Sequence, residues 1–323
     1  MGRAGSAERG GISFVSGVFV TGGTGFVGLP LLTSLARQER DVHAVSRSES
    51  FPSVPGVTWH RLDLADSQGL EALLDELRPQ RLVHAAWYVE HGHFWDAPQN
   101  VPWVEHSLHL LRAFAAAGGR RAVLLGTCAE YDWSAAQGPL HEDRSAIAPA
   151  TLYGVAKDSL RRLAFAYAEQ VGLELAWGRL FFLYGPREAP GRVVASVARA
   201  LLKGEPAKTT SGVQERDFMH VQDAARATVQ LLRAPVVGTV NIASGERRST
   251  ASLVEVIAGS IGRPELVERG ALPDRAGEPR LLLADVARLR EEVGFRPRFA
   301  LEDGLRDTID WWRRHDSGAT DLR

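Results

Sequence analysis

The sequence predicts an α/β protein with a doubly wound parallel sheet, followed by a smaller C-terminal α/β lobe. Apolar runs rich in β-branched residues alternate with segments of helical periodicity as far as about Leu180, which is typical of a parallel sheet covered by helices on both faces. A glycine turn joins the first strand to the first helix. After Leu180 the alternation stops, and glycine and proline gather around residues 185–191, 204–212 and 263–279. We therefore expect a second, smaller lobe there.

The first strand, turn and helix provide the most informative stretch. Residues 18–20 form an apolar strand, and Gly22, Gly25 and Gly28 follow at G-x-x-G-x-x-G spacing before an apolar helix. A helix that begins there directs unpaired N–H groups and the positive end of its dipole above the turn, and glycines let a pyrophosphate approach the backbone. The turn therefore indicates a nucleotide phosphate site, with a purely structural turn as the alternative.

The remaining elements of the first lobe follow in order. Strands are expected at Val42–Ser46, Val57–Leu62, Arg81–Ala86, Ala122–Leu125 and Leu173–Leu180, and helices at Ser67–Leu77, Leu108–Ala117 and Tyr153–Val171. Right-handed crossovers between such strands give a Rossmann fold with its ligand at the carboxyl ends of the strands. We expect a nucleotide-binding Rossmann domain over residues 12–180, with later segments at about 214–257 woven back into it. Residues 181–316 are expected to form mainly the second lobe, which would bind substrate.

Composition excludes several classes of function. The chain has 323 residues and a formal net charge of −1, so there is no electrostatic reason to expect nucleic acid or an anionic membrane as a partner. Its single cysteine, Cys128, excludes an internal disulfide and a cysteine-built zinc site. Residues Met1–Gly10 lack the apolar core of a signal peptide and are interpreted as a loose leader. No apolar run approaches the ~20 residues that span a bilayer. We expect a cytoplasmic protein.

The end of the second strand bears on the choice of dinucleotide. In adenine-dinucleotide folds an acidic residue at this point holds the ribose 2′-hydroxyl of NAD, but here the strand ends Val45-Ser46-Arg47-Ser48. Arg47 and the serines can hold a 2′-phosphate through charge-assisted bonds. We therefore expect the cofactor to be NADP, used as NADPH, with NAD as the alternative. The competing interpretation of Arg47 is that it is a solvated loop arginine without a role in binding. Asp63, followed by Leu64, is a candidate acceptor for the adenine amine, and capping of the next helix is the alternative.

Three residues form a candidate catalytic group. Tyr153 and Lys157 are four residues apart on a predicted helix and therefore share one face. A tyrosine hydroxyl, with an unperturbed pKa of about 10, needs a nearby cation to act as acid or base near neutral pH, and Lys157 can supply it. Thr127 follows a buried strand at the sheet edge where ligands bind, so its hydroxyl can hydrogen-bond a substrate oxygen. The Tyr/Lys spacing alone is also common on surface helices.

Together these motifs resemble the extended short-chain dehydrogenase/reductase family, in particular its nucleotide-sugar branch. The resemblance runs from Val18 to Trp312. It rests on Thr21-Gly22-Gly23-Thr24-Gly25-Phe26-Val27-Gly28, Asp63-Leu64, His84-Ala85-Ala86, Thr127, Tyr131, Tyr153, Lys157, Arg179–Pro186, Arg216–Asp223 and Asn241–Gly245.

The resemblance implies a Rossmann lobe that binds NAD or NADP and a C-terminal lobe that binds a nucleoside-diphosphate sugar. It implies Tyr153 as the acid/base and Lys157 as the anchor of the nicotinamide ribose that also tunes Tyr153. Thr127 would hold the reacting oxygen, and Arg216 would contact the substrate's diphosphate or nucleoside. The implied cofactor contacts are Gly22, Thr24, Gly25, Phe26, Val27, Asp63, Leu64, Ala85, Ala86 and Leu180, with Tyr153 and Lys157. Family habit also implies a homodimer through a four-helix bundle that includes Tyr153–Val171.

Departures from the family pattern narrow the reaction. Nucleotide-sugar 4,6-dehydratases carry an Asp-Glu pair just after the catalytic threonine, where this chain has Cys128 and Ala129, so elimination of water lacks its acid and base. Glu130 comes one place later and is expected to point away, a shifted register being the alternative. The family's frequent asparagine before Tyr-Gly-Pro is replaced by Phe182. Cys128 is expected to pack as a small buried thiol, and both it and Phe182 are candidate substrate contacts.

Further candidate substrate contacts are aromatic and basic. Trp87 begins the stretch Trp87–Trp95, whose aromatic and histidine side chains can stack against a sugar ring or can simply seal the loop. No metal site is expected there, because its two histidines have no third ligand nearby. Arg192 and Arg280 are candidates to bind the substrate diphosphate. The alternative for each is an ion pair on the protein surface.

The sequence therefore predicts an NADPH-dependent enzyme that reduces a nucleoside-diphosphate 4-keto-6-deoxy sugar at C4, with Tyr153 as the proton donor. The alternative is an NAD-dependent nucleotide-sugar 4-epimerase, which uses the same residues. A 4,6-dehydratase is less favoured because its carboxylates are missing. A non-catalytic NADP sensor is less favoured because it would not be expected to keep the Tyr153/Lys157 pair.

Overall fold

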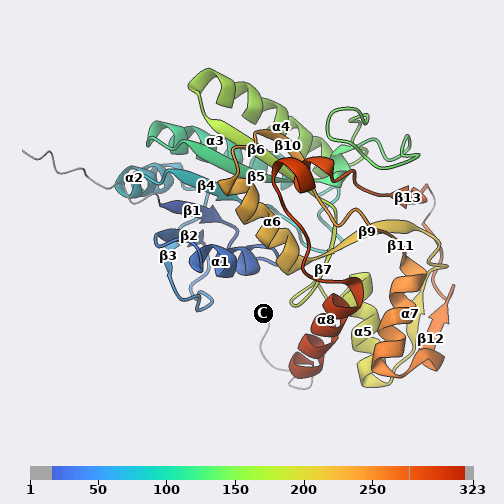
Figure 1. Ribbon diagram of the computed structural model, residues 1–323. Coiled ribbons are helices and arrows are strands. Elements are labelled where there is room, and N and C mark those ends of the chain that lie inside the picture. The colour runs from blue at the N-terminus through green and yellow to red at the C-terminus, as the bar shows by residue number, and fades with distance from the viewer. Residues whose placement is uncertain (1–16, 276, 317–323) are drawn as a thin grey trace, which may run out of the picture.

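A computed structural model describes residues 17–275 and 277–316. The predicted leader Met1–Gly10, and the first residues of the predicted 12–180 domain, lie outside the described residues. Figure 1 shows a large sheet with helices on both faces, and a smaller lobe built from later parts of the chain at the lower right. Among the described residues, no helix has both the length and the apolar character needed to cross a bilayer.

The large sheet has seven strands in the described part of the chain, all paired in parallel, in the order β10-β6-β5-β4-β1-β2-β3. Counted outward from β1, strands β2 and β3 lie on one side and β4, β5 and β6 on the other, which is the order of doubly wound dinucleotide folds. The predicted Rossmann fold is confirmed. The strands are β1 (Val18–Thr21), β2 (Val42–Ser46), β3 (Val57–Arg61), β4 (Arg81–His84), β5 (Arg121–Thr127), β6 (Glu174–Leu180) and β10 (Gly238–Ile242).

Alternate side chains of the strands pack against two separate layers of helices. In β1, Val18 and Val20 belong to the core beneath α1 (Gly28–Ala36) and α6 (Val221–Arg233), whereas Phe19 belongs to the core on the opposite face. That second face carries α2 (Ser67–Leu77), α3 (Asn100–Ala116) and α4 (Leu152–Val171). The buried apolar runs of the sequence are therefore strands covered on both sides.

The smaller lobe packs α5, α7 and α8 around a core of its own, which Trp312 helps to close. Its elements are β7 (Phe182–Tyr184), α5 (Val193–Lys203), β8 (Ala207–Thr209), β9 (Glu215–His220), β11 (Arg247–Ser249), α7 (Thr250–Ile261), η2 (Pro264–Leu266), β12 (Val267–Arg269), β13 (Leu281–Leu282) and α8 (Leu301–His315). The short helix η3 (Arg288–Glu292) lies instead against β10 of the large sheet. Strands β7, β9, β11 and β13 form one small sheet, and β8 pairs with β12.

Three of the predicted elements differ from the observed ones by two residues or more at one end. β4 ends at His84, before Ala85, and β5 continues to Thr127. α3 begins at Asn100 rather than Leu108. The Asn100 side chain accepts a hydrogen bond from Trp87 Nε1 and donates to the carbonyl oxygens of two residues in the preceding loop. These side-chain hydrogen bonds fix the start of α3 at Asn100, and the apolar periodicity of the sequence does not indicate them.

Candidate active site

A cavity of about 450 Å³ lies at the carboxyl ends of the central strands, where doubly wound sheets bind their ligands. It brings together most of the predicted site residues, whereas Arg216 and Arg280 are not among the residues that line it. The predicted residues in its lining are Gly22, Thr24, Gly25, Phe26, Val27, Arg47, Asp63, Leu64, Ala85, Ala86, Trp87, Thr127, Cys128, Tyr153, Lys157, Leu180, Phe182 and Arg192.

Gly22 and Gly28 of the glycine turn leave no room for a side chain. Gly22 has a φ of 74°, and a Cβ there would lie 2.5 Å from the Ala86 nitrogen. A Cβ on Gly28 would lie 1.9 Å from the Gly22 oxygen. Helix α1 starts beside the cavity, which Val27 and Gly28 line, and its N-cap residue Val27 supplies no side-chain cap, so the positive end of the helix dipole is available to an anion. The cradle fits the diphosphate of a dinucleotide.

The residues after β2 and β3 line the part of the cavity where the adenosine of a dinucleotide would lie. Arg47 is exposed and borders the cavity directly after Ser46. Asp63 also lines it, and its Oδ1 accepts a hydrogen bond from the Ala65 nitrogen. The alternative prediction, that Asp63 caps the next helix, is wrong. Asp66 caps α2 instead, by accepting a hydrogen bond from the Gly69 nitrogen.

Thr127, Tyr153 and Lys157 meet at the carboxyl end of β5. Thr127 is the last residue of that strand, and Tyr153 lies in the first turn of α4. Lys157 Nζ donates to the Leu125 carbonyl oxygen at 2.9 Å and lies 3.9 Å from the centre of the Trp87 ring. The two predicted catalytic helix residues therefore share one face, turned toward the strand end.

Burial dominates the electrostatics of this group. It raises the pKa of Tyr153, against the lowering effects of a hydrogen bond with Thr127 and the charge of Arg192. Burial also lowers the pKa of Lys157 to about 7, although the negative charge of Glu130 opposes this. The phenol therefore stays protonated near neutral pH and can donate a proton, while Lys157 is close to the pH at which it loses its charge.

His84 is a site residue whose role the sequence did not reveal. Its Nε2 lies 2.8 Å from Ser107 Oγ, and that hydroxyl donates to the Trp103 carbonyl oxygen, so Nε2 carries the proton. Nδ1 then accepts from Thr21 Oγ1 at 2.7 Å, and Thr21 Oγ1 accepts from the Ala86 nitrogen at 3.3 Å. Burial lowers the pKa of His84 to about 3, which keeps the ring neutral. The chain of bonds fixes Ala86 where it borders the cavity.

Aromatic side chains line the cavity next to Tyr153. The Tyr153 ring meets Phe94 and Trp95 edge-on, with centroids 5.0 and 5.8 Å away, and Trp95 meets Trp133 in the same way. Cys128 lies beside them and is 5% exposed. Burial raises the pKa of its thiol to about 12, so the thiol stays protonated and uncharged near neutral pH. This agrees with the prediction that Cys128 packs as a small buried thiol.

The three candidate arginines lie in different surroundings. Arg192 lines the cavity, and its Nε lies 3.4 Å from a carboxylate oxygen of the buried Glu188. Arg216 is 4% exposed, bonds to Glu278 at 2.7 Å and lies behind Phe182, with 5.4 Å between its guanidinium carbon and that ring's centre. Arg280 is exposed. Substrate contact by any of the three stays a prediction.

Glu130 does not face the cavity. Its side chain is fully buried and pairs with Arg179 Nε at 2.7 Å in the interior. The shifted register that would have offered Glu130 to a substrate is therefore wrong. Within the described ranges, no group of three or more histidine, cysteine, aspartate or glutamate residues could hold a metal ion.

Comparisons with known proteins match nearly the whole chain. A family model described as "NAD dependent epimerase/dehydratase family" matches residues 18–243. The chain is 28% identical to dTDP-4-dehydro-6-deoxy-D-allose reductase from Streptomyces bikiniensis, over 92% of this chain and 96% of that one. It is 29% identical to UDP-glucose 4-epimerase from Mycolicibacterium smegmatis, over 91% and 97%. The solved structure of MoeE5 in complex with UDP-glucuronic acid and NAD superposes with a TM-score of 0.80 at 31% identity, covering 93% of this chain and 99% of that one.

Proposed function

The chain belongs to the NAD dependent epimerase/dehydratase family of extended short-chain dehydrogenase/reductases, and on that premise we propose that it reduces a nucleoside-diphosphate 4-keto-6-deoxy sugar at C4 with NADPH. The observation that carries the proposal is that no carboxylate lines the part of the cavity beside Tyr153, among the residues that the structure describes. Among the described residues that line the cavity, Asp63 is the only carboxylate. It follows β3, whereas Thr127 ends β5 on the other side of β1.

This arrangement suits a reduction better than an elimination. Reduction of a ketone requires one proton donor, and a buried phenol that stays protonated provides it. Elimination of water needs a further acid and base, and the positions where dehydratases carry them are Cys128 and Ala129 here. The relative of 28% identity from S. bikiniensis, a dTDP-4-dehydro-6-deoxy-D-allose reductase, supports the same substrate class.

The wall beside Tyr153 supports a 6-deoxy sugar. Phe94, Trp95 and Trp133 line the cavity at this point with apolar ring surface. Such a surface contacts a C6 methyl group favourably, whereas it would leave a C6 hydroxyl or carboxylate without a hydrogen-bond partner.

The proposal assigns a role to each of the main residues of the site. A reduced nicotinamide dinucleotide, when bound, would supply the hydride that forms the new C4–H bond. Tyr153 donates the proton to the new C4 oxygen, and Thr127 hydrogen-bonds that oxygen and keeps it beside the phenol. Lys157 binds a ribose hydroxyl, and its charge stabilises the phenolate that forms when Tyr153 gives up its proton. Arg192 faces the substrate diphosphate.

The test is an assay of the purified enzyme with dTDP-4-keto-6-deoxyglucose and either NADPH or NADH. We expect one NADPH to be oxidised for each sugar reduced, measured by nicotinamide absorbance, with a new C4 hydroxyl identified by NMR. No cofactor oxidation with this ketone, together with interconversion of UDP-glucose and UDP-galactose without added cofactor, would contradict the reductase and establish the epimerase.

The epimerase remains the second candidate because of the comparisons. A UDP-glucose 4-epimerase is 29% identical over nearly the whole chain, and the MoeE5 structure of 31% identity contains NAD. An epimerase regenerates its cofactor in each cycle, so it predicts NAD+ that stays with the protein through purification. The reductase predicts a cofactor that exchanges freely.

Arg47 decides between the two dinucleotides in our proposal. The Arg47→Ala variant is expected to bind NADPH roughly 10- to 100-fold more weakly, because a hydrogen bond to a charged group contributes about 1.5–3 kcal/mol. NADH binding is expected to stay unchanged, since it has no 2′-phosphate. Both affinities are measured by titration of nicotinamide fluorescence. Arg61→Ala is the matched control, because Arg61 is an exposed arginine that pairs with Glu49 and does not line the cavity. Equal weakening of both cofactors by Arg47→Ala would contradict the assignment.

A further inference from the structure

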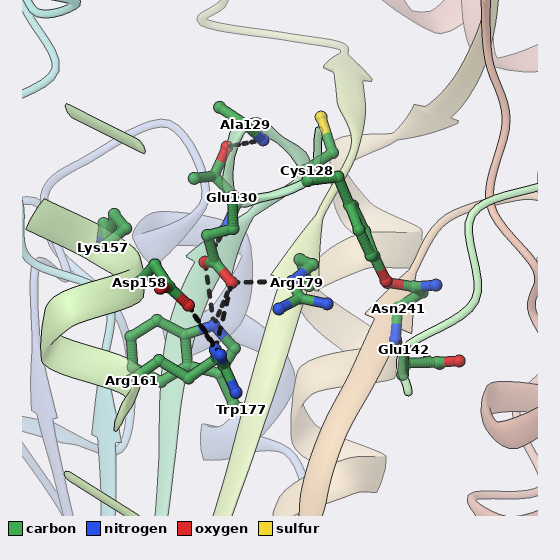
Figure 2. Close-up of polar contacts among 12 residues, drawn as sticks. Cys128, Ala129, Glu130, Glu142, Lys157, Asp158, Arg161, Trp177, Arg179 and Asn241 are labelled. Atoms are coloured by element: carbon green, nitrogen blue, oxygen red, sulfur yellow. Dashed lines mark hydrogen bonds and ion pairs between the residues drawn. The ribbon is translucent and has the colours of Figure 1, made fainter. Parts of the chain in front are cut away.

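We propose that Glu130 is a positioning residue of the catalytic site, which holds the Thr127 turn in place and supplies a buried negative charge that acts on Lys157. The inference rests on the proposed roles of Thr127 and Lys157. Figure 2 shows the Glu130 carboxylate beneath the turn that carries Cys128 and Ala129, joined by dashed lines to side chains of neighbouring elements. The proposed mechanism leaves this fully buried acid without a task.

Glu130 is bonded directly to the catalytic turn. Thr127 is the N-cap of the short helix η1 (Cys128–Glu130), and its Oγ1 accepts from the Ala129 nitrogen. Glu130 Oε1 reaches back and accepts from the Thr127 nitrogen at 2.8 Å. These reciprocal bonds form a capping box. The carboxylate therefore fixes the backbone from which the Thr127 hydroxyl projects.

The carboxylate is held from below by β6. Arg179 Nε donates to Oε2 at 2.7 Å, and Trp177 Nε1 donates to Oε1 and Oε2 at 3.0 and 3.2 Å. Arg161 of α4 approaches Oε2 at 3.8 Å while it pairs with Asp158. The same contacts explain Gly126, where a Cβ would lie 1.9 Å from Trp177 Nε1 and 2.4 Å from Glu130 Oε1.

The negative charge of this carboxylate acts electrostatically on Lys157. Glu130 raises the pKa of Lys157 against the effect of burial. The other groups around the ammonium do not provide a negative charge: the Leu125 carbonyl accepts its hydrogen bond, the Trp87 ring lies beneath it, and His84 of β4 is neutral. Tyr153, on the same helix, keeps its proton near neutral pH because burial raises its pKa. Among these neighbours, Glu130 is therefore the anion that favours charged Lys157.

A purely structural role would not require an acid at this position. Replacing a buried ion pair by apolar residues of similar volume is often neutral or stabilising, so stability alone does not account for Glu130 and Arg179. A carboxylate at this place does two things that an apolar side chain cannot. It accepts the Thr127 N–H, and it opposes the loss of the proton from Lys157.

The composition of the chain allows a direct test. The chain contains three lysines, Lys157, Lys203 and Lys208, so ¹³C-labelled lysine gives three side-chain signals, and titration by NMR follows Lys157 without cofactor or substrate. In Glu130→Gln we expect the Lys157 midpoint to fall by about one pH unit, since a neighbouring charge typically shifts a pKa by 1–3 units. Because the mechanism needs charged Lys157, the decline of kcat with rising pH should begin at correspondingly lower pH, with KM for the sugar nearly unchanged.

Glu39→Gln is the matched control. Glu39 pairs with Arg81 at 2.7 Å, at the amino end of β4 and away from the cavity. It should lose stability without moving the Lys157 midpoint or the pH profile. A Lys157 midpoint and pH profile in Glu130→Gln that match those of the unmodified enzyme would overturn the proposal and leave Glu130 a structural residue.

Glu130→Gln removes one partner of a buried pair and leaves the charge of Arg179 uncompensated, which can prevent folding. A second variant keeps the test decisive in that case. The double variant Glu130→Gln with Arg179→Met buries no such charge, so we expect it to fold while the Lys157 midpoint stays low. A normal midpoint in this variant would also overturn the proposal. The NMR midpoint does not depend on which sugar is reduced, so a failure of the proposed reaction and a failure of this inference give different results.

Discussion

Replacing Tyr153 by phenylalanine is expected to lower kcat by roughly 10²- to 10⁴-fold, the usual contribution of a positioned acid, and to leave cofactor affinity unchanged. The substitution removes only the hydroxyl that bonds to Thr127. The edge-on contacts of the ring with Phe94 and Trp95 remain, and so does Lys157, which is assigned to the ribose. Single-turnover reduction of the sugar measures the chemical step, and fluorescence titration measures cofactor binding.

Tyr184→Phe provides the matched control for this result. Tyr184 is also buried, burial likewise raises its pKa, and its hydroxyl donates to the Leu301 carbonyl oxygen in the smaller lobe. It does not line the cavity, so its loss should affect stability more than turnover. If Tyr153→Phe turned over at the rate of the unmodified enzyme, another group would have to donate the proton, and the proposed mechanism would be wrong.

The sequence predicted well those features that depend on residues close together in the chain. The bounds of β2 and α2 coincide with the predicted Val42–Ser46 and Ser67–Leu77, because each element has a clear apolar period of its own. The spacing of Tyr153 and Lys157 placed both on one helix face, and the cavity contains both. Such signals are local, so they can be read before the fold is known.

Features that depend on contacts between distant segments were not predicted. Glu130 and Arg179 are 49 residues apart in sequence and meet only because β5 and β6 are neighbours. The sequence favoured a Glu130 that points away from the cavity but assigned no partner to it. Arg216 pairs with Glu278, and its guanidinium carbon lies 5.4 Å from the centre of the Phe182 ring; the motif that contains Arg216 indicated neither partner. Side-chain partners of this kind follow from the packing of elements that are distant in the chain.

Gly28→Ala is expected to lower the stability of the protein by about 1–3 kcal/mol, the usual cost of overpacking. The added Cβ would lie 1.9 Å from the Gly22 oxygen, which belongs to backbone and cannot rotate away. Gly22 cannot shift freely either, because its own backbone lies against Ala85 and Ala86. The turn must open, and the diphosphate cradle opens with it. We therefore also expect affinity for NADPH and NADH alike to fall by about 100-fold, equivalent to about 3 kcal/mol.

Two glycines separate these effects when thermal unfolding and cofactor titration are measured together. Gly259 lies in α7 with nothing near its Cβ position, so Gly259→Ala should stabilise the protein by about 0.5–1 kcal/mol. Gly25 lines the cavity, and a Cβ there would meet only the Gly22 oxygen, at 3.3 Å. Gly25→Ala should therefore keep nearly normal stability but lose cofactor affinity. Normal cofactor binding by Gly28→Ala would mean that the turn is only a structural link between β1 and α1. Weak cofactor binding by a stable Gly25→Ala protein would support a ligand that approaches this backbone.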